Sequence, residues 1–210
     1  MPKSEPFDKY SAEYDDWFTE NPEGYAAELE TVRRLMPVSG TETIEIGIGS
    51  GKFAGPLNIK TGVDPAHNML ARTKKLGISV CRGVAEALPF PDDRFNLVLM
   101  VTTICFVDDI RRSFREAFRI LKNNGCIIVA FIDRESLLGH RYAEKKEKSR
   151  FYREAVFFSA AEVLEHLKKS GFAISDVRQT LVPGEPPETV LQGFGEGSFV
   201  AIKGLKNRAG

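Results

Sequence analysis

The stretch from Thr43 to Asp64 constrains the fold more than any other part of the sequence. A short run, Thr-Ile-Glu-Ile, leads into the turn Gly47–Gly51, which reads Gly-Ile-Gly-Ser-Gly, and a second short run ends at Asp64. Three glycines at alternate positions remove three Cβ atoms from one turn, so a ligand can approach the bare backbone amides. We therefore expect a strand, a ligand-binding turn, a short crossover helix and a second strand.

The residues around this turn indicate which nucleoside cofactor fits. The dinucleotide pattern G-x-G-x-x-G needs a glycine at position 52, where this chain has Lys52. Glu45 closes the first strand, and a carboxylate there would repel a pyrophosphate but attract a cofactor that carries an ammonium and a sulfonium. The turn therefore favours a cationic cofactor, with a generic doubly wound nucleotide fold as the alternative.

Length and charge limit the class of protein. A chain of 210 residues, 42% of them hydrophobic, predicts one domain over residues 1–210. Lys and Arg number 29, as do Asp and Glu, so no overall field recruits nucleic acid or an anionic membrane. A small-molecule substrate fits this balance better.

Cysteine usage and hydropathy indicate the compartment. Cys81, Cys105 and Cys126 are odd in number and widely spaced, which predicts core thiols rather than a disulfide framework or a metal site. The sequence has neither an apolar signal core at its start nor an apolar run of about 18 residues. We expect a soluble, cytoplasmic protein that is not exported.

A second motif gives the glycine turn a family context. The run from Gly83 to Phe90, Gly-Val-Ala-Glu-Ala-Leu-Pro-Phe, follows an expected strand at Ser79–Arg82. With Glu45 and the turn, it resembles the class I S-adenosylmethionine-dependent methyltransferases of the small-molecule type, with motifs E/D-x-G-x-G-x-G and G-D-A-E-x-L-P-F. The resemblance extends from about Phe7 to Lys203 and implies S-adenosylmethionine as the cofactor.

The resemblance also implies an architecture, which the periodicity of the sequence supports. We expect an α/β, doubly wound, Rossmann-like sheet of seven mostly parallel strands with an antiparallel last strand, plus an N-terminal helical cap. The expected strands cover residues 44–46, 62–64, 79–82, 95–101, 126–132, 172–182 and 197–203. The expected parts are a cap or lid (1–40), a cofactor-binding half (41–133), a substrate-region insertion (134–158), and a final helix with edge strands (159–210).

Two helical features in these parts are specific. In the cap, Tyr10, Tyr14, Trp17 and Phe18 have the spacing of one helical face, which either docks on the core or closes over the cofactor. Ser159 precedes the final helix and has Glu162 three residues on, which predicts a capping box.

The resemblance assigns roles to individual cofactor-binding candidates. Asp64 would accept the ribose hydroxyls, with a helix N-cap as the alternative, and Met69 would lie against adenine. Val84 stands where the family has an Asp, which leaves the backbone of Ala85 to meet the adenine edge. The full set of candidates is Tyr14, Trp17, Glu45, Ile46, Gly47, Gly49, Gly51, Asp64, Pro65, Met69, Val84, Ala85, Val101, Thr102 and Phe106.

Methyl transfer asks little of side chains, because the methyl of a sulfonium is already electrophilic and positioning carries most of the catalysis. Many relatives have histidines near the positions of Cys105 and Phe106, and this chain has none there. If the acceptor arrives protonated, the candidates for proton handling are Asp133, His140 and Tyr142, and each could equally be structural.

The acceptor and two alternative functions stay open at this point. The segment Thr102–Cys105 lacks the N/D-P-P-Y/F tetrapeptide of amino-methylating DNA enzymes, which favours a small-molecule acceptor of carbon, oxygen or nitrogen type. A catalytically silent cofactor-binding module is one alternative, and a nicotinamide-dependent oxidoreductase, disfavoured by Glu45 and Lys52, is the other. A homodimer would use the edge of the sheet.

Overall fold

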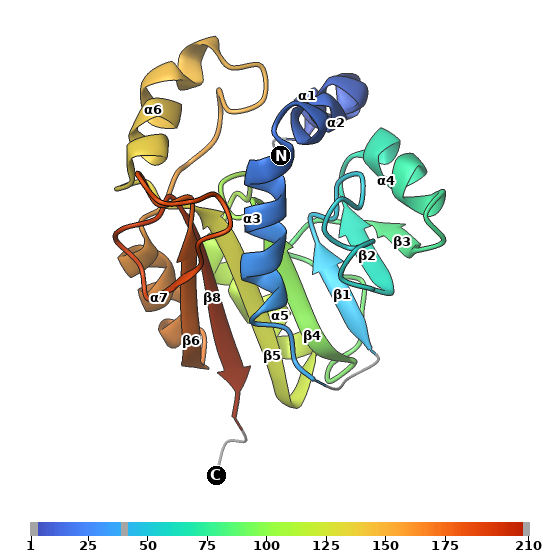
Figure 1. Cartoon of the computed structure of the whole chain (residues 1–210). Helices are drawn as coiled ribbons and strands as arrows, with labels where there is room; N and C mark the ends of the chain where they lie inside the picture. The colour runs from blue at the N-terminus through green and yellow to red at the C-terminus, as the bar shows by residue number, and fades with distance from the viewer. Residues whose placement is uncertain (1–3, 39–41, 208–210) are drawn as a thin grey trace.

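The centre of the fold is one sheet, seen in a computed structural model that describes residues 4–38 and 42–207 (Figure 1). Within these residues the sheet has eight strands in the order β3-β2-β1-β4-β5-β8-β6-β7. Strands β1 to β5 are parallel, and β8 is antiparallel to both β5 and β6. The bounds are β1 Thr43–Ile46, β2 Thr61–Asp64, β3 Ser79–Arg82, β4 Phe95–Val101, β5 Leu121–Ile132, β6 Phe172–Thr180, β7 Leu191–Gln192 and β8 Phe199–Lys206.

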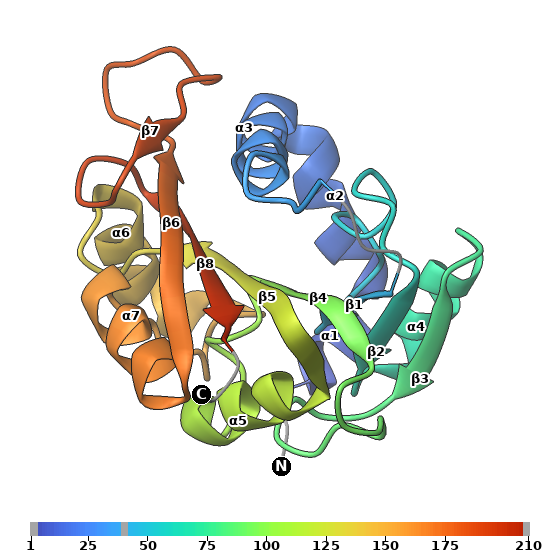
Figure 2. The ribbon, with the colours of Figure 1, turned by 90° about the horizontal axis from the view of Figure 1, so that it is seen from below.

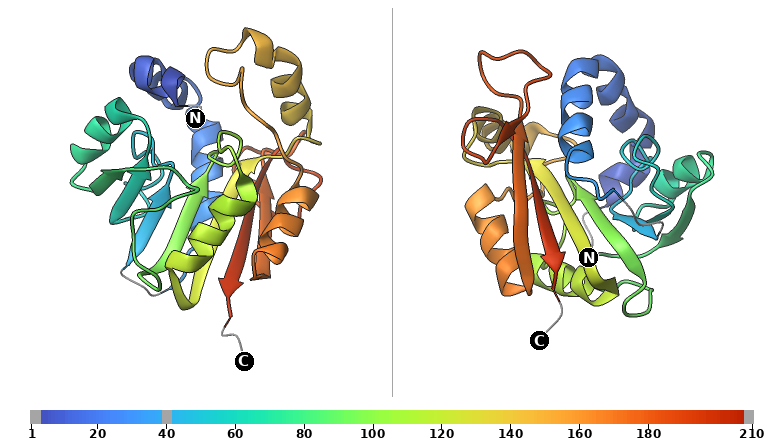
Figure 3. Two further views of the ribbon diagram at one scale, coloured as in Figure 1. Left: turned by 180° about the vertical axis from the view of Figure 1, so that it is seen from behind. Right: turned by 60° about the horizontal axis from the view of Figure 1, so that its bottom comes forward.

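Helices cover both faces of this sheet (Figures 2 and 3). Side chains of β5 alternate: Ile127 and Val129 pack with the cluster under α5 and α7, whereas Ile128 packs with the cluster under α3 and α4. No helix among the described residues has the length and apolar character that a membrane span requires. The helices are α1 Glu5–Lys9, α2 Ser11–Glu20, α3 Pro22–Arg33, α4 His67–Lys74, α5 Ile110–Ile120, α6 Leu137–Lys145, α7 Ala160–Lys169 and the 3₁₀ helix η1 Lys146–Lys148.

The doubly wound α/β class is confirmed, and the strand count exceeds the predicted seven by one. The additional strand, β7, has only two residues, Leu191 and Gln192, which pair antiparallel with Gln179 and Arg178 of β6. It lies inside the loop that the sequence places between the last two strands. The predicted capping box at Ser159 is also present.

Two local predictions are wrong. The crossover after Gly51 contains no helix: residues 51–58 form consecutive turns, because Gly55 and Pro56 disfavour a helix and Asn58 takes a positive φ of 58°. The predicted aromatic face of the cap is broken at Tyr10, which has φ −120° and ψ 34° and separates α1 from α2.

The carboxyl ends of β1, β2 and β4 meet at one edge of the sheet, and two segments cover that edge (Figure 1). One is the N-terminal pair α1 and α2, and the other is the region 134–158, which folds as α6, η1 and the loop toward α7. The two segments touch, since the rings of Phe7 and Phe151 are 5.4 Å apart and Arg150 forms an ion pair with Glu13. The covered edge is where a ligand site is expected in an open α/β sheet.

Candidate functional site

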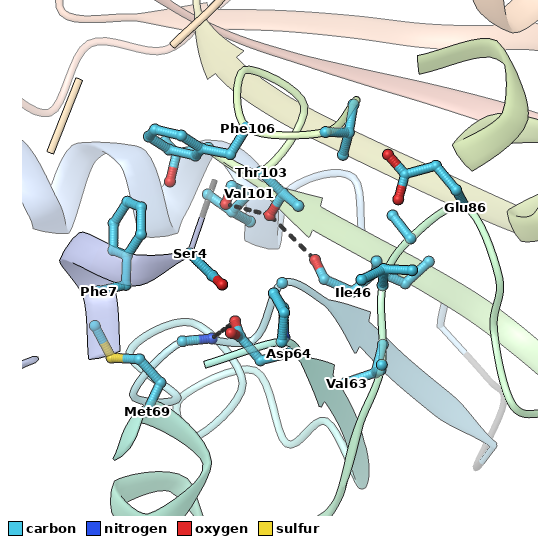
Figure 4. A pocket seen from close by; sticks show the side chains of 18 of the residues that line it. Ser4, Phe7, Ile46, Val63, Asp64, Met69, Glu86, Val101, Thr103 and Phe106 are labelled. Atoms are coloured by element: carbon cyan, nitrogen blue, oxygen red, sulfur yellow. Dashed lines mark hydrogen bonds between the residues drawn. The ribbon is translucent and has the colours of Figure 1, made fainter. Parts of the chain in front are cut away.

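A cavity lies under these covering segments, with an empty volume of about 810 Å³ that includes its open mouth (Figure 4). The figure shows Asp64 and Thr103 on opposite sides of this space, with Phe7 and Met69 to one side. Most of the predicted cofactor-binding residues form its wall: Tyr14, Ile46, Gly47, Gly49, Asp64, Pro65, Met69, Val84, Ala85, Val101, Thr102 and Phe106.

Three predicted cofactor-binding residues lie outside the wall. Trp17 packs edge-on against Phe18 at 5.1 Å within the cap. A Cβ at Gly51 would meet Leu76 at 2.8 Å, so this glycine permits close packing against the end of α4 and the turn that follows it. Glu45 is 2% exposed, because its side chain leaves β1 on the opposite face from its neighbours and is buried within the protein.

The glycine turn has the geometry that only glycine allows easily. Gly47 and Gly49 have φ of 71° and 53°. A Cβ on Gly47 would come within 2.4 Å of the Thr103 side chain, which itself donates a hydrogen bond to the carbonyl of Ile46. A Cβ on Gly49 would meet only Tyr14, at 3.9 Å, so the backbone at Gly49 is open toward the cavity.

Asp64 holds this turn in place. Its Oδ2 accepts a hydrogen bond from the amide of Gly49 at 2.9 Å, and its Oδ1 accepts one from Ala66, the N-cap residue of α4, at 2.8 Å. Burial raises the pKa of Asp64 to about 6. A carboxylate oxygen has two lone pairs, so both oxygens can still accept a bond from a ligand hydroxyl.

Glu45 carries an unsatisfied buried atom. One carboxylate oxygen accepts a bond from the amide of Ala54, and Oε2 has no hydrogen-bond partner among the described residues. Burial, together with the nearby charge of Asp64, raises the pKa of Glu45 well above its usual range. A buried oxygen without a donor is costly, and a cationic ligand close by would lower that cost.

The nearby acids also affect the pKa of Tyr14, which lies on the cavity wall. Burial raises the pKa of this phenol, as do the charges of Glu45, Glu28 and Asp64, whereas a hydrogen bond with the Thr102 side chain lowers it. Buried carboxyl groups therefore lie close to the cavity, and a positively charged ligand there would favour their ionised forms.

A second, smaller cavity adjoins the first and shares Thr102 and Tyr152 with it; its empty volume of about 330 Å³ includes open solvent. The ring of Tyr152 stacks on Phe106 at 5.8 Å and on Tyr142 at 5.2 Å. These three stacked rings extend from the wall of the first cavity to the wall of the second. Thr102 has a φ of 50°, a strained conformation for a β-branched residue, at this junction.

The structure does not bring the three candidates for proton handling together. Asp133 is buried, and its Oδ1 accepts hydrogen bonds from the amides of Glu135 at 3.0 Å and Ala160 at 3.3 Å, so it anchors the start of α7. His140 is exposed on α6, and Tyr142 borders the second cavity.

Several wall residues were not predicted as ligand contacts. Ser4, Phe7 and Tyr152 come from segments without a motif, and only the long-range fold brings them to the cavity. Glu86 also borders it, and its Oε1 accepts hydrogen bonds from the amides of Asp108 and Asp109 just before α5.

Comparisons with known proteins indicate the family of this chain. A family described as "Methyltransferase domain" matches residues 44–129. An uncharacterized protein of Methanocaldococcus jannaschii is 44% identical over 203 residues, which cover 95% of this chain and 98% of that protein. A ubiquinone biosynthesis O-methyltransferase of Azorhizobium caulinodans is 27% identical over 161 residues, 69% of this chain and 64% of that protein.

A solved structure matches nearly the whole chain. The crystal structure of an S-adenosylmethionine-dependent methyltransferase of Thermotoga maritima, named as a "possible histamine N-methyltransferase", is 44% identical and has a TM-score of 0.92. The match covers 98% of this chain and 100% of that one. The chain therefore belongs to the S-adenosylmethionine-dependent methyltransferase family of class I.

Proposed function

We propose that this protein transfers a methyl group from S-adenosylmethionine to a small-molecule acceptor. The observation that carries the proposal is the cavity at the carboxyl ends of β1, β2 and β4, where the glycine turn, Asp64 and the Gly83–Phe90 motif meet in an acidic environment. S-adenosylmethionine has an ammonium and a sulfonium, so its charge complements the acids that surround the cavity.

The wall residues divide naturally among the parts of this cofactor. Asp64 would accept the ribose hydroxyls, and the backbone of Ala85 would meet the adenine edge, beside Met69. The open backbone at Gly49 would face the amino-acid part, whose ammonium would lie in the field of Glu45. Phe7 and Tyr14 would close over the ligand and exclude water.

When bound, the cofactor supplies a methyl group that is already electrophilic. The protein must therefore hold the acceptor in line with the methyl, which alone supplies on the order of 7 to 11 kcal/mol of the barrier. The second cavity, which adjoins the first at Thr102 and Tyr152, is the natural place for the acceptor. The names of two relatives, which refer to histamine and to ubiquinone biosynthesis, support a small-molecule acceptor.

Thermal unfolding with S-adenosylmethionine, S-adenosylhomocysteine and NAD in parallel tests the cofactor. At a ligand concentration about a hundred times the dissociation constant, binding stabilises the fold by roughly 2.7 kcal/mol. Each kcal/mol moves the midpoint by roughly 2 to 4 °C in a domain of this size. We expect shifts with both sulfur compounds and none with NAD, and a shift with NAD alone would overturn the proposal.

A silent cofactor-binding module would give the same shifts, so catalysis needs its own measurement. We expect S-adenosylhomocysteine to be released when the protein and S-adenosylmethionine are mixed with a panel of small amines, phenols and thiols. Cofactor binding without turnover of any acceptor in such a panel would favour the silent module.

A further inference from the structure

Side chains from different elements hold the glycine turn. The amide of Gly49 donates to Asp64 at 2.9 Å, and its carbonyl accepts a hydrogen bond from Thr73 Oγ1 at 2.7 Å. Asp64 ends β2 and Thr73 lies on the buried face of α4, so both belong to the core. The next residue, Ser50, instead donates its hydroxyl hydrogen to the carboxylate of Asp15 on α2. The turn is therefore bonded both to the core and to a helix that covers the cavity.

The carboxylate of Asp15 also joins α2 to α4. Its Oδ2 accepts hydrogen bonds from the guanidinium of Arg72, at 2.8 Å from Nε and 2.7 Å from Nη2. Lys52 Nζ lies 4.0 Å from Oδ1, so a second cation faces the same acid. The Asp15 side chain is 17% exposed and Ser50 is 6% exposed, so water reaches this cluster only in part. Charge-assisted hydrogen bonds in such a place are stronger than exposed ion pairs.

Another contact attaches the N-terminal segment to α4 about one helical turn earlier. The amide of Asn68 donates to Oδ1 of Asp8 at 2.8 Å, and the side-chain amide of Asn68 donates to the Asp8 carbonyl at 2.9 Å. Asn68 and Arg72 are four residues apart, so they lie on the same face of α4. Figures 1 and 3 show α1 and α2 next to this helix. The bonds of Asp8 end at α4, whereas those of Asp15 continue to the glycine turn.

We propose that Asp15 is a positioning residue for the methyl donor, which holds the glycine turn in its ligand-binding geometry while α2 covers the cavity. This inference rests on the proposed function, because the ligand that the turn would serve is S-adenosylmethionine. Tyr14, the residue before Asp15, lines the cavity, so an opening of α2 that releases the ligand also withdraws the carboxylate from Ser50. The turn then loses one of its partners, and a buried hydroxyl loses its acceptor.

Closure of α2 and binding of the ligand should therefore favour each other. The two events share the hydrogen bond between Asp15 and Ser50, so a ligand that orders the turn stabilises the closed helix, and the closed helix retains the ligand. Loss of this bond should act mainly on the dissociation rate, because the bond holds a state that forms after the ligand has entered. Asp15 touches neither the methyl group nor the acceptor in this proposal.

The test measures how fast S-adenosylhomocysteine leaves variants of this pair. The variants are D15A, S50A and the double variant, with D16A as the matched control, since Asp16 is an exposed acid on the same helix. Surface plasmon resonance on the immobilised protein gives both rate constants. We expect D15A and S50A each to raise the dissociation rate roughly tenfold, with little change in the association rate. D16A should match the wild type in both.

A double-mutant cycle separates a specific link from general damage to the cap. If Ser50 acts through Asp15, the double variant loses S-adenosylhomocysteine no faster than D15A alone, whereas independent effects would multiply the rates. S50A keeps the carboxylate and its ion pair with Arg72, so it tests the link even where D15A does not fold.

The same data distinguish two kinds of failure. If the wild type does not bind S-adenosylhomocysteine, the proposed function fails and this inference fails with it. If the wild type binds it, but S50A keeps the wild-type dissociation rate or the two substitutions act independently, only the positioning role of Asp15 is overturned.

Discussion

At the scale of single residues, the glycine turn combines two separate demands on the backbone. Gly47 is required by packing, because a side chain there would collide with Thr103. Gly49 is required by its φ of 53° and by its position, since its missing Cβ leaves space at the cavity wall. The two demands can be separated by substitution.

Gly49→Ala should lose ligand binding because the new Cβ lies at the cavity wall, in addition to the backbone strain that it causes. Alanine at positive φ costs about 1 to 2 kcal/mol of stability. Gly77 has a φ of 75° with no atom within 4 Å of its missing Cβ, so Gly77→Ala carries the same strain at a residue that does not line the cavity. We expect both variants to lose similar stability in urea, and only Gly49→Ala to lose S-adenosylhomocysteine affinity in calorimetry. Equal affinity in the two variants would contradict the role given to Gly49.

Site residues could be predicted from the sequence when their contacts lie within a short motif, and not when their contacts join segments far apart in the chain. Gly49 and Asp64 belong to a short motif whose geometry is local, so their place on the wall follows from the sequence. Tyr152 reaches the wall only because a loop far along the chain folds back over β4. Glu28 did leave a signal: it shares helical spacing with buried Thr31, Val32 and Leu35, and an acid on such a face is unusual.

At the scale of elements, the two segments that cover the cavity form one structure. Phe7 of α1 contacts Phe106 at 4.8 Å and Phe151 at 5.4 Å, and Arg150 lies over the ring of Tyr10 at 4.4 Å. These contacts join the N-terminal helices to the loop after η1 across the cavity mouth. We expect this cover to open further when a ligand enters through the cavity mouth.

Hydrogen exchange should detect that opening. Because Phe7 and Tyr14 line the cavity, a bound ligand must be released before the cover opens, and binding adds its free energy to the cost of opening. We expect S-adenosylhomocysteine to slow amide exchange in α1, α2 and residues 150–152. The loop at residues 183–190, which does not line either cavity, is the internal control. Unchanged exchange in α1 and α2 would contradict the cover.

The sequence makes Asp133 a candidate for proton handling, whereas in the structure its carboxylate accepts backbone hydrogen bonds at the start of α7. Its carboxylate bonds the amide of Ala160 in the first turn of α7, which Ser159 also caps. We expect Asp133→Ala to lower the free energy of unfolding by about 1 to 3 kcal/mol, measured in urea, and to leave S-adenosylhomocysteine affinity unchanged. His140→Ala should change neither quantity, because His140 is exposed. Lost methyl transfer in a stable Asp133→Ala variant would restore its catalytic role.

At the scale of the whole molecule, the sheet could be predicted because parallel strands buried on both faces appear as continuous apolar runs. Strand β4 is the clearest case, with the predicted bounds of Phe95–Val101. The crossover at residues 51–58 and the short strand β7 escaped prediction, because turns and two-residue pairings are decided by tertiary packing.

The same packing surrounds the site with acids that resist ionisation, so the stability of the molecule should depend on pH. Folding raises the pKa of Glu28 to about 8 and of Asp64 to about 6, and that of Glu45 well above its usual range. Between the unfolded and folded pKa values the folded state holds more protons than the unfolded state. Stability from these groups is therefore complete below the unfolded pKa values and falls as pH rises toward the folded ones.

Glu28 allows this dependence to be measured on one residue. Between pH 5.5 and 8.5, a shift from 4.5 to about 8 removes on the order of 3 kcal/mol of stability from the wild type, and E28Q removes the titrating group itself. We expect urea denaturation to show E28Q gaining stability relative to the wild type as pH rises across this window. E23Q should follow the wild type at both pH values, because Glu23 is exposed. If the wild type and E28Q instead lose stability in parallel, burial does not raise the pKa of Glu28 in the folded protein.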